Sequence, residues 1–405
     1  MKKCSDLDKV VRKLLVKYNL IGRTSTRASI YLHPKYSGLG LYSIEKEVEI
    51  QYVRKGLYLE HHPDLIETRN KFKRLVKAGW RNPLSDSQFI LEKYEINLPN
   101  IQTNTILPEY IREITIKIKD LQQERTLKTW TGSSYYGRMV RQNFPNIIFP
   151  IFYEIDTEDW VVSILRQAAE EQVQGLGADM FNRVRCRKGC AADENSYHVI
   201  SGCICPEYNV RHDFAVFWVI KYILLATKAP DDIKSKLNYG KASIVTEYNW
   251  ENRNIKIKAG VKIQTENRLY HNRPDIYIQL TNPDEILVIE LSVAHLQNID
   301  LQEKIKKTRY SKNSCIYINK DNYDTVPRDL NIIEHLKKAY KYPTSLGIFV
   351  IGALGEICLT PEHQNFKKLM NKVGVKGDYF KNLIKKCSVS VATSSAKLII
   401  QRLKS

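Results

Sequence analysis

The sequence predicts a multidomain protein with a helical N-terminal half, a small CCHC zinc knuckle and a C-terminal α/β domain. Three observations support this prediction. Apolar residues recur at helical spacing before about residue 185, four cysteines cluster between residues 186 and 205, and apolar and polar residues alternate as in strands from about residue 240. A chain of 405 residues has room for two or three domains, each with its own core.

Five segments are expected: a helical region at 1–95, a helical linker at 96–180, the knuckle with its following helix at 181–225, the α/β domain at 226–375 and a basic tail at 376–405. In the first segment, Leu7–Tyr18 carries apolar residues three and four apart. Glu45–Leu59 and Thr68–Ala78 resume this helical spacing after a glycine-containing break at 37–41. The linker is also helical in pattern, but more polar.

The pattern changes to that of strands in the C-terminal part. Apolar residues alternate with lysine and glycine from Ile255 to Ile263, which predicts a half-buried strand. Further strands are expected at the short apolar runs 276–278, 286–291, 315–318 and 348–351. Helical segments at 301–310 and 330–340 lie between the later runs. This order predicts a mixed α/β domain.

The charge of the chain favours a polyanionic partner. Its 63 lysines and arginines exceed its 44 aspartates and glutamates, which gives a net charge of +19. Such an excess suits nucleic acid or an anionic membrane surface. The longest apolar run, Phe214–Ala226, is too short to cross a bilayer, and no strongly amphipathic basic helix with an aromatic face stands out. We therefore expect nucleic acid, and no membrane, as the partner.

Four residues have the types and spacing of a zinc site. Cys186 and Cys190 are separated by three residues, His198 follows after seven more, and Cys203 after a further four. Three thiolates and one imidazole can close a tetrahedron around Zn²⁺, and four protein ligands leave no open position for chemistry. The site is therefore expected to be structural. Cys205 competes with Cys203 for the fourth position, and the sequence leaves both open.

Basic residues flank the cysteines at Arg183, Arg185, Arg187 and Lys188. They indicate that the knuckle holds a loop that contacts nucleic acid.

A pair of carboxylates suggests a second metal site. Asp275 stands at the start of one apolar run, and Glu290 ends the next, with a turn expected at 281–285. Two carboxylates on neighbouring strands repel each other, so they need a cation between them. Mg²⁺ or Mn²⁺ fits, with the backbone carbonyl of Leu291 as a further ligand, and a metal-bound water can attack a phosphodiester. The alternative is that the two acids are ordinary turn and strand-end polar residues.

Hydrolysis also requires a cation near the phosphate. Many nucleases of this architecture carry a lysine two residues after the glutamate, but Ser292 occupies that position here. The next helix offers Lys304, Lys307 and Tyr310, spaced three residues apart on one face. We expect Lys307 and Tyr310 in the site and interpret Lys304 as a solvated residue. Asp231-Asp232, which resembles another metal pair, is expected to begin a helix.

Taken together, these residues resemble the C-terminal part of site-specific non-LTR retrotransposon proteins with a restriction-like endonuclease. Cys186, Cys190, His198 and Cys203 match the CCHC knuckle of that family. Arg273-Pro274-Asp275 with Glu290 matches its PD-(D/E)XK-like core, in which the lysine lies in the following helix, as Lys307 does here with Tyr310. The segments 20–23, 38–41 and 43–45 look like the thumb that follows a polymerase palm. Trp130, Trp160 and 174–176 are similar to the family's linker.

The resemblance implies a magnesium-dependent DNA endonuclease that acts in the nucleus, where a nicked chromosomal strand primes reverse transcription of the element RNA. It also implies nucleic-acid contacts by Arg211 and His212, which are similar to a short basic motif of the family, and by Arg273. No Tyr/Phe-x-Asp-Asp motif occurs, so we expect no reverse transcriptase activity from this chain. It is either a fragment of a longer reading frame or a repurposed copy. The alternative function is that of a nucleic-acid-binding remnant without catalysis.

Overall fold

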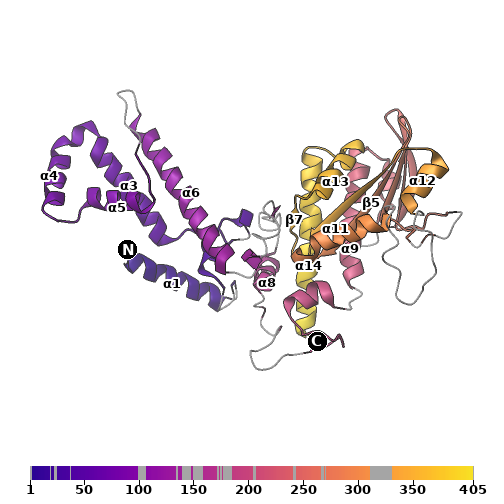
Figure 1. Cartoon of the computed structure of the whole chain (residues 1–405), viewed down its shortest axis with the longest axis horizontal. Helices are drawn as coiled ribbons and strands as arrows, with labels where there is room; N and C mark the ends of the chain where they lie inside the picture. The colour runs from indigo at the N-terminus through magenta and orange to yellow at the C-terminus, as the bar shows by residue number, and fades with distance from the viewer. Residues whose placement is uncertain are drawn as a thin grey trace. The chain divides into compact units, whose positions relative to one another are not determined.

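The computed structural model describes residues 2–18, 20–21, 25–36, 38–98, 106–133, 136–138, 147–148, 158–170, 173, 176, 185–203, 207–239, 243–265, 269, 271–310 and 331–404. The chain divides into two compact units, Met1–Arg138 and Met139–Ser405. Figure 1 shows helices in the first unit and a sheet with covering helices in the second. A mixed helical and α/β architecture is thus confirmed.

The first unit is built from helices, which are α1 (Lys2–Lys17), α2 (Arg27–Tyr31), α3 (Ile44–His61), α4 (Ile66–Lys77), α5 (Pro83–Lys93) and α6 (Leu107–Ser133). The helices expected at 7–18, 45–59 and 68–78 are confirmed. Side chains fix where two of them begin: the hydroxyl of Ser43 accepts from the amide of Lys46, and Asn82 and Ser85 form a capping box before α5. The buried carboxylate of Asp8 accepts from the amide of Ile44, which joins α1 to the first turn of α3.

The core of the first unit extends beyond the expected boundary at residue 95. Helices α3, α5 and α6 enclose a cluster of buried residues: Ile50, Val53, Leu57, Ile90, Leu91, Tyr94, Ile96, Tyr110, Ile114 and Ile118. Since Ile96 and the first half of α6 supply part of this core, residues up to 138 fold with the segment expected to end at 95.

The second unit contains a five-stranded mixed sheet. Its strands are β2 (Ile244–Trp250), β3 (Arg253–Ala259), β4 (Ile276–Leu280), β5 (Glu285–Ala294) and β6 (Thr344–Gly352). They lie in sequence order, with antiparallel pairs from β2 to β5 and a parallel β5–β6 pair. Strands expected at 255–263, 276–278, 286–291 and 348–351 are confirmed, although β3 ends at Ala259. The run 315–318 lies outside the described residues, and β2 was not expected.

Helices cover both faces of this sheet. The described helices of the second unit are α8 (Asp159–Ala169), α9 (Glu207–Ala226), α10 (Asp231–Lys234), α11 (Ile299–Tyr310), α12 (Ile332–Tyr340), α13 (Pro361–Lys372) and α14 (Asp378–Lys404), of which α8 packs on α14. A short antiparallel pair joins β1 (Ile147–Ile148) to β7 (Ile357–Cys358). On β5, Leu287, Ile289 and Leu291 pack with α9, α13 and α14. Ile286 and Val288 pack with α11 and α12 on the other face. Burial on both faces explains the continuous apolar run.

The expectation of a basic tail at 376–405 is corrected by the structure. Residues 378–404 form the 27-residue helix α14, which packs along α9 (Figure 1). Its fully buried residues, spaced three or four apart, are Leu383, Cys387, Ser388, Val391, Ala392, Ser395, Ala396 and Ile399. Five lysines lie among the remaining positions, and their charge hid this spacing in the sequence.

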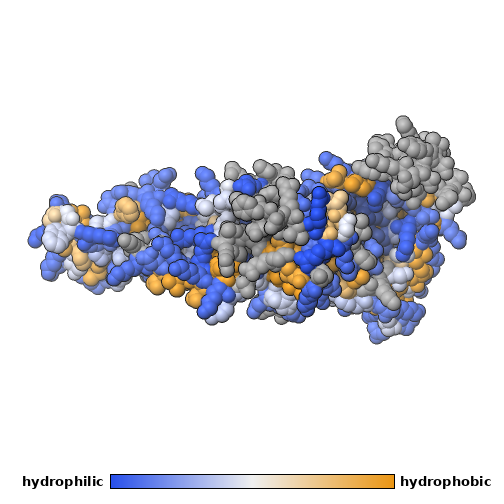
Figure 2. Space-filling view, turned by 90° about the horizontal axis from the view of Figure 1, so that it is seen from below, coloured by the Kyte–Doolittle hydropathy of each residue, from blue (hydrophilic) through white to orange (hydrophobic). Residues whose placement is uncertain are grey.

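Within the described residues, no helix combines the length and hydropathy needed to cross a bilayer. On the face seen in Figure 2, hydrophilic residues predominate and hydrophobic ones gather in small groups. The pair Asp231-Asp232 begins helix α10, as expected.

If α14 is part of the core, Ile399→Ala should lower the free energy of unfolding by about 2–5 kcal/mol, because the truncation leaves a cavity in a fully buried site. The exposed Lys397 on the same helix provides the control, and Lys397→Ala should change the free energy by less than about 0.5 kcal/mol. Urea unfolding followed by circular dichroism measures both. Equal, small effects would show that α14 is not integral to the core.

Candidate carboxylate site and metal centre

The strand register brings Asp275 and Glu290 together. Asp275 directly precedes β4, and Glu290 lies within β5 beside Ile289, the partner of Ile276. The amide of Asp275 donates to Oε1 of Glu290 at 3.1 Å, and the amide of Leu291 donates to Oδ2 of Asp275 at 2.7 Å. Glu290 is only 2% exposed. Leu291, expected to offer its carbonyl to a metal, thus contacts the site through its amide.

The lysine in this site is Lys306, which corrects the expectation for Lys307. Nζ of Lys306 lies 2.6 Å from Oε2 of Glu290 and 3.6 Å from Oδ2 of Asp275. Lys307 is largely exposed and pairs with Glu362 at 2.8 Å. The buried residues Ile299, Glu303 and Tyr310 set the inner face of α11, and Lys306 lies nearer its centre than Lys307.

Tyr310 lies in the site, as expected. Its hydroxyl donates to Oε1 of Glu290 at 2.5 Å, and its side chain is 4% exposed. Burial and the charge of Glu290 raise the pKa of Tyr310 far above its usual range, so it stays a neutral donor.

His212 is the site residue whose position the sequence did not reveal. It was expected to contact nucleic acid, but Nε2 of His212 lies 3.3 Å from Oδ2 of Asp275, and Nδ1 lies 3.3 Å from Oδ1 of Asp213. Burial alone lowers the pKa of His212, but hydrogen bonds to Asp213 and Asp275 outweigh it and raise the pKa to about 9. The imidazolium therefore faces Asp275 at neutral pH.

The two carboxyl groups have opposite pKa shifts. Burial raises the pKa of Asp275, but the hydrogen bond and charge of His212, with the charge of Lys306, outweigh it and lower the pKa to about 2. Burial and the negative charge of Asp275 raise the pKa of Glu290. Two neighbouring carboxyl groups with separated pKa values are typical of sites that hold a cation or transfer a proton.

The donor set at these carboxylates suits Mg²⁺ only in part. Two carboxylates with waters are common ligands of this ion, but Lys306 already supplies a positive charge to both. A magnesium ion would have to compete with that ammonium group. Among the described residues, the group of metal-ligand side chains that converges is the cysteine and histidine cluster.

Cys186, Cys190, His198 and Cys203 converge as expected, each with a ligand atom within 4.8 Å of the others. Sγ of Cys203 lies 3.6 Å from that of Cys186 and 3.8 Å from that of Cys190. Zn–S bonds of about 2.3 Å in a tetrahedron place sulfurs about 3.8 Å apart, so the spacing fits zinc. Nε2 of His198 is buried without a hydrogen-bond partner in the described structure. Cys205 lies outside the described residues.

The thiol pKa values favour a cation at this centre. Burial alone raises the pKa of Cys186, but hydrogen bonds from Arg402 and from the amide of Lys188 outweigh it and lower the pKa to about 5. Burial and the hydrogen bonds to Cys186 and Cys190 raise the pKa of Cys203 to about 11. Cys186 therefore forms a thiolate readily, whereas Cys203 forms one when a metal ion offsets its charge.

The basic residues expected to bind nucleic acid differ in how exposed they are. The expected nucleic-acid contact by Arg211 is corrected, because this residue is only 2% exposed. It donates to the carbonyl of Ile200 at 2.7 Å and to Oγ of Ser395 at 2.8 Å. It joins α9 to the knuckle and α14 and is not available to a polyanion. Arg273 is exposed, and its Nε donates to the carbonyl of Gly260.

Around the knuckle, three of the four flanking cations are exposed and one lies outside the described residues. Arg185 donates to the carbonyl of Ala191, and Arg187 pairs with Glu194 at 2.7 Å. Lys188 is exposed, and Arg183 is not described. The knuckle therefore presents positive charge at its surface, part of which is committed to its own fold.

Comparison with known proteins adds no assignment, since no protein-family model matches the chain and no match was found among curated proteins.

If Cys203 is the fourth ligand, Cys203→Ser should release zinc to a chelator that leaves the unaltered protein loaded, because a hydroxyl replaces a thiolate ligand. Cys205→Ser is the matched control and should keep a full complement of zinc. Elemental analysis after chelator dialysis measures both variants. Zinc loss in Cys205→Ser with retention in Cys203→Ser would assign the position to Cys205.

Proposed function

We propose that this chain is a metal-dependent DNA endonuclease whose active site is formed by Asp275, Glu290 and Lys306. The observation that carries the proposal is the contact of Lys306 with two carboxylates, the buried Glu290 on β5 and the half-buried Asp275 just before β4. Two neighbouring carboxylates repel each other, so such a pair favours a bound cation. The net charge of +19 supports a polyanionic substrate.

In this proposal Asp275 and Glu290 would hold Mg²⁺ or Mn²⁺, and the ion would supply an acidified water molecule and charge to offset the phosphate. Lys306 would turn from the carboxylates to the scissile phosphate and stabilise the charge that develops there. Tyr310 fixes Glu290 through its hydroxyl, and His212 fixes Asp275 through Nε2. These two neutral or cationic donors keep the carboxylates oriented while Lys306 moves.

We further propose that the chain acts with a non-LTR retrotransposon, nicking chromosomal DNA in the nucleus with the element RNA as a second partner. The CCHC spacing from Cys186 to Cys203 and the Arg273-Pro274-Asp275 motif support this assignment. The position of the lysine on α11, following β5, agrees with the same family pattern.

Plasmid nicking tests the active site. With Mg²⁺ or Mn²⁺, Asp275→Asn, Glu290→Gln and Lys306→Gln should each lower the nicking rate by about 100-fold or more, because each removes a charged group from the reacting centre. Lys307→Gln is the matched control: the residue is adjacent, exposed and paired with Glu362, so its rate should stay unchanged.

Asp275→Asn and Glu290→Gln keep the size of the side chains and so limit the loss of stability. Deleting one member of a buried ion pair lowers the free energy of unfolding by about 3–5 kcal/mol. Circular dichroism of each variant checks that the fold is retained. Equal nicking by Asp275→Asn, Glu290→Gln and the unaltered protein contradicts the proposal, as does loss of nicking in Lys307→Gln alone.

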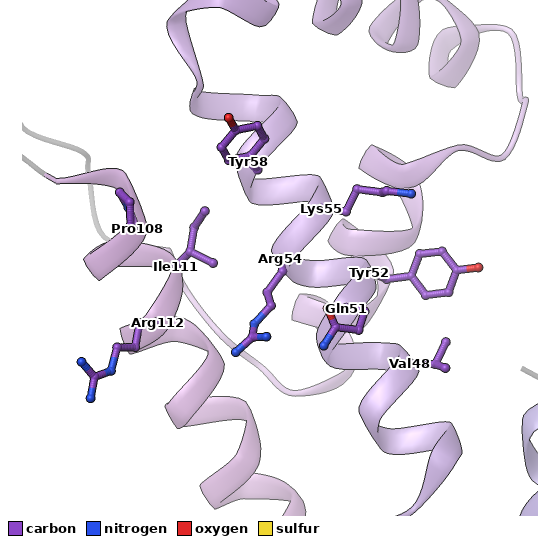
Figure 3. A pocket seen from close by; sticks show the side chains of 9 residues that line it. All are labelled: Val48, Gln51, Tyr52, Arg54, Lys55, Tyr58, Pro108, Ile111 and Arg112. Carbon is purple, nitrogen blue, oxygen red and sulfur yellow. The ribbon is translucent and has the colours of Figure 1, made fainter.

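A groove in the first unit favours a second candidate function, nucleic-acid binding without cleavage. The groove has a volume of about 830 Å³ and runs between α3 and α6 (Figure 3). Nine residues line it: Val48, Gln51, Tyr52, Arg54, Lys55, Tyr58, Pro108, Ile111 and Arg112. Three carry positive charge and none is acidic, and the two tyrosines offer rings on which bases can stack.

Salt dependence of binding tests this groove. Arg54→Gln and Arg112→Gln should each weaken binding of a labelled single-stranded oligonucleotide and reduce the slope of log affinity against log salt by about 1. Lys71 is an exposed cation on α4 outside the groove, so Lys71→Gln should change the slope less than either of the other two variants does. Binding without nicking under either metal favours this second function, and unchanged slopes in all three variants contradict it.

A further inference from the structure

A buried arginine lies against the knuckle. Arg402, in the last turn of α14, is 4% exposed. One terminal nitrogen of its guanidinium lies 3.3 Å from Sγ of Cys186, and the other lies 3.1 Å from Sγ of Cys203. The first also donates to Oε2 of Glu194 at 3.0 Å. One guanidinium fork thus reaches two of the four candidate zinc ligands.

The chemistry of this contact fixes the direction of its hydrogen bonds. A guanidinium has only donors and stays charged at all ordinary pH values, so Sγ of Cys186 and Sγ of Cys203 must accept. Thiolates bound to a metal are such acceptors, and hydrogen bonds to ligand atoms orient them and tune the metal.

The charges of this cluster, counted with the exposed Arg187, balance when a divalent cation is added. Cys186, Cys190 and Cys203 as thiolates, with Glu194, supply four negative charges, and Glu194 is 1% exposed. Arg402 and Arg187, which both pair with Glu194, supply two positive charges. A divalent ion makes up the difference. Uncompensated buried charge is costly in free energy, so the two arginines stabilise the centre by offsetting its negative charge.

The knuckle in turn holds the helix. A terminal nitrogen of Arg187 donates at 2.7 Å to the carbonyl of Arg402, one of the last carbonyls of α14, which have no partner within the helix. Seven residues earlier on the same face, Ser395 accepts from Arg211, which also binds the carbonyl of Ile200 in the knuckle turn η4 (His198–Gly202). Two arginines, the exposed Arg187 and the buried Arg211, therefore join the knuckle to α14.

We infer that Arg402 is a positioning residue of the zinc centre: it holds the thiolates of Cys186 and Cys203 in place and supplies the positive charge that the centre requires. It does not touch the metal. The centre is then formed by the segment 186–203 together with a residue that follows Cys203 by 199 positions. This inference depends on zinc binding by the knuckle and not on DNA cleavage.

The experiment measures zinc affinity by competition with a chromophoric chelator, using the full chain. Arg402→Gln should weaken zinc binding by about 10- to 100-fold, as loss of an outer partner of a ligand does. Arg402→Lys keeps the charge without the fork and should recover part of the affinity. Lys404→Gln, an exposed cation two residues along α14, is the matched control and should bind like the unaltered protein.

A spectroscopic readout separates positioning from mere stability. With Co²⁺ in place of zinc, the sulfur-to-cobalt charge-transfer band should move to lower energy in Arg402→Gln, because hydrogen bonds no longer stabilise the thiolate electrons. Loss of folding alone removes the band and does not shift it. If Arg402→Gln fails to fold, a shifted band in Arg402→Lys supports the inference.

An unshifted band and unchanged zinc affinity in the folded variants would overturn the inference, and so would an unaltered protein that binds no zinc. A protein that binds zinc as expected but nicks no DNA contradicts the proposed nuclease and leaves this inference supported.

Discussion

The second unit depends on the neutralisation of one buried carboxylate. Glu290 interrupts an otherwise apolar strand, between Ile289 and Leu291, and faces the layer formed by α11 and α12. Such a charge is tolerated only with close partners. Lys306 and Tyr310 supply them from α11, and the amide of Asp275 supplies another from the start of β4. The contacts of Lys306 and Tyr310 with Glu290 thus help to hold α11 in its place on the sheet.

The same principle of compensation operates at the knuckle, on the other side of α9. There the excess negative charge comes from thiolates and Glu194, and arginines replace the lysine. Helix α9 joins the two centres, since Arg211 reaches the knuckle turn and the neighbouring His212 reaches Asp275. The segments that the sequence separated into knuckle, α/β domain and tail therefore lie in one compact unit, in which α14 is shared by the sheet core and the candidate metal centre.

Short-range features were predictable, and long-range ones were not. Asp275 and Glu290 meet because a hairpin sets their register, and the residues of the turn are visible in the sequence. The choice of Lys306 over Lys307 depends on about 100° of rotation around α11, which only its packing decides. His212 lies far from Asp275 in the chain, so no local pattern connects them. Helix α14 was missed because its many lysines masked a regular spacing of small and apolar residues, and Arg402 looked like one more surface cation.

The link between Arg402 and the cysteines also has a consequence for synthesis of the chain. The ribosome adds Cys203 to the chain 199 residues before it adds Arg402. At roughly 5–20 residues per second, that interval lasts about 10–40 s. During this time the nascent knuckle has its thiols and Glu194 but lacks the guanidinium from α14. Newly made chains therefore pass through a stage in which their cysteines are open to oxidation or to a competing metal, and completion of the last helix ends it.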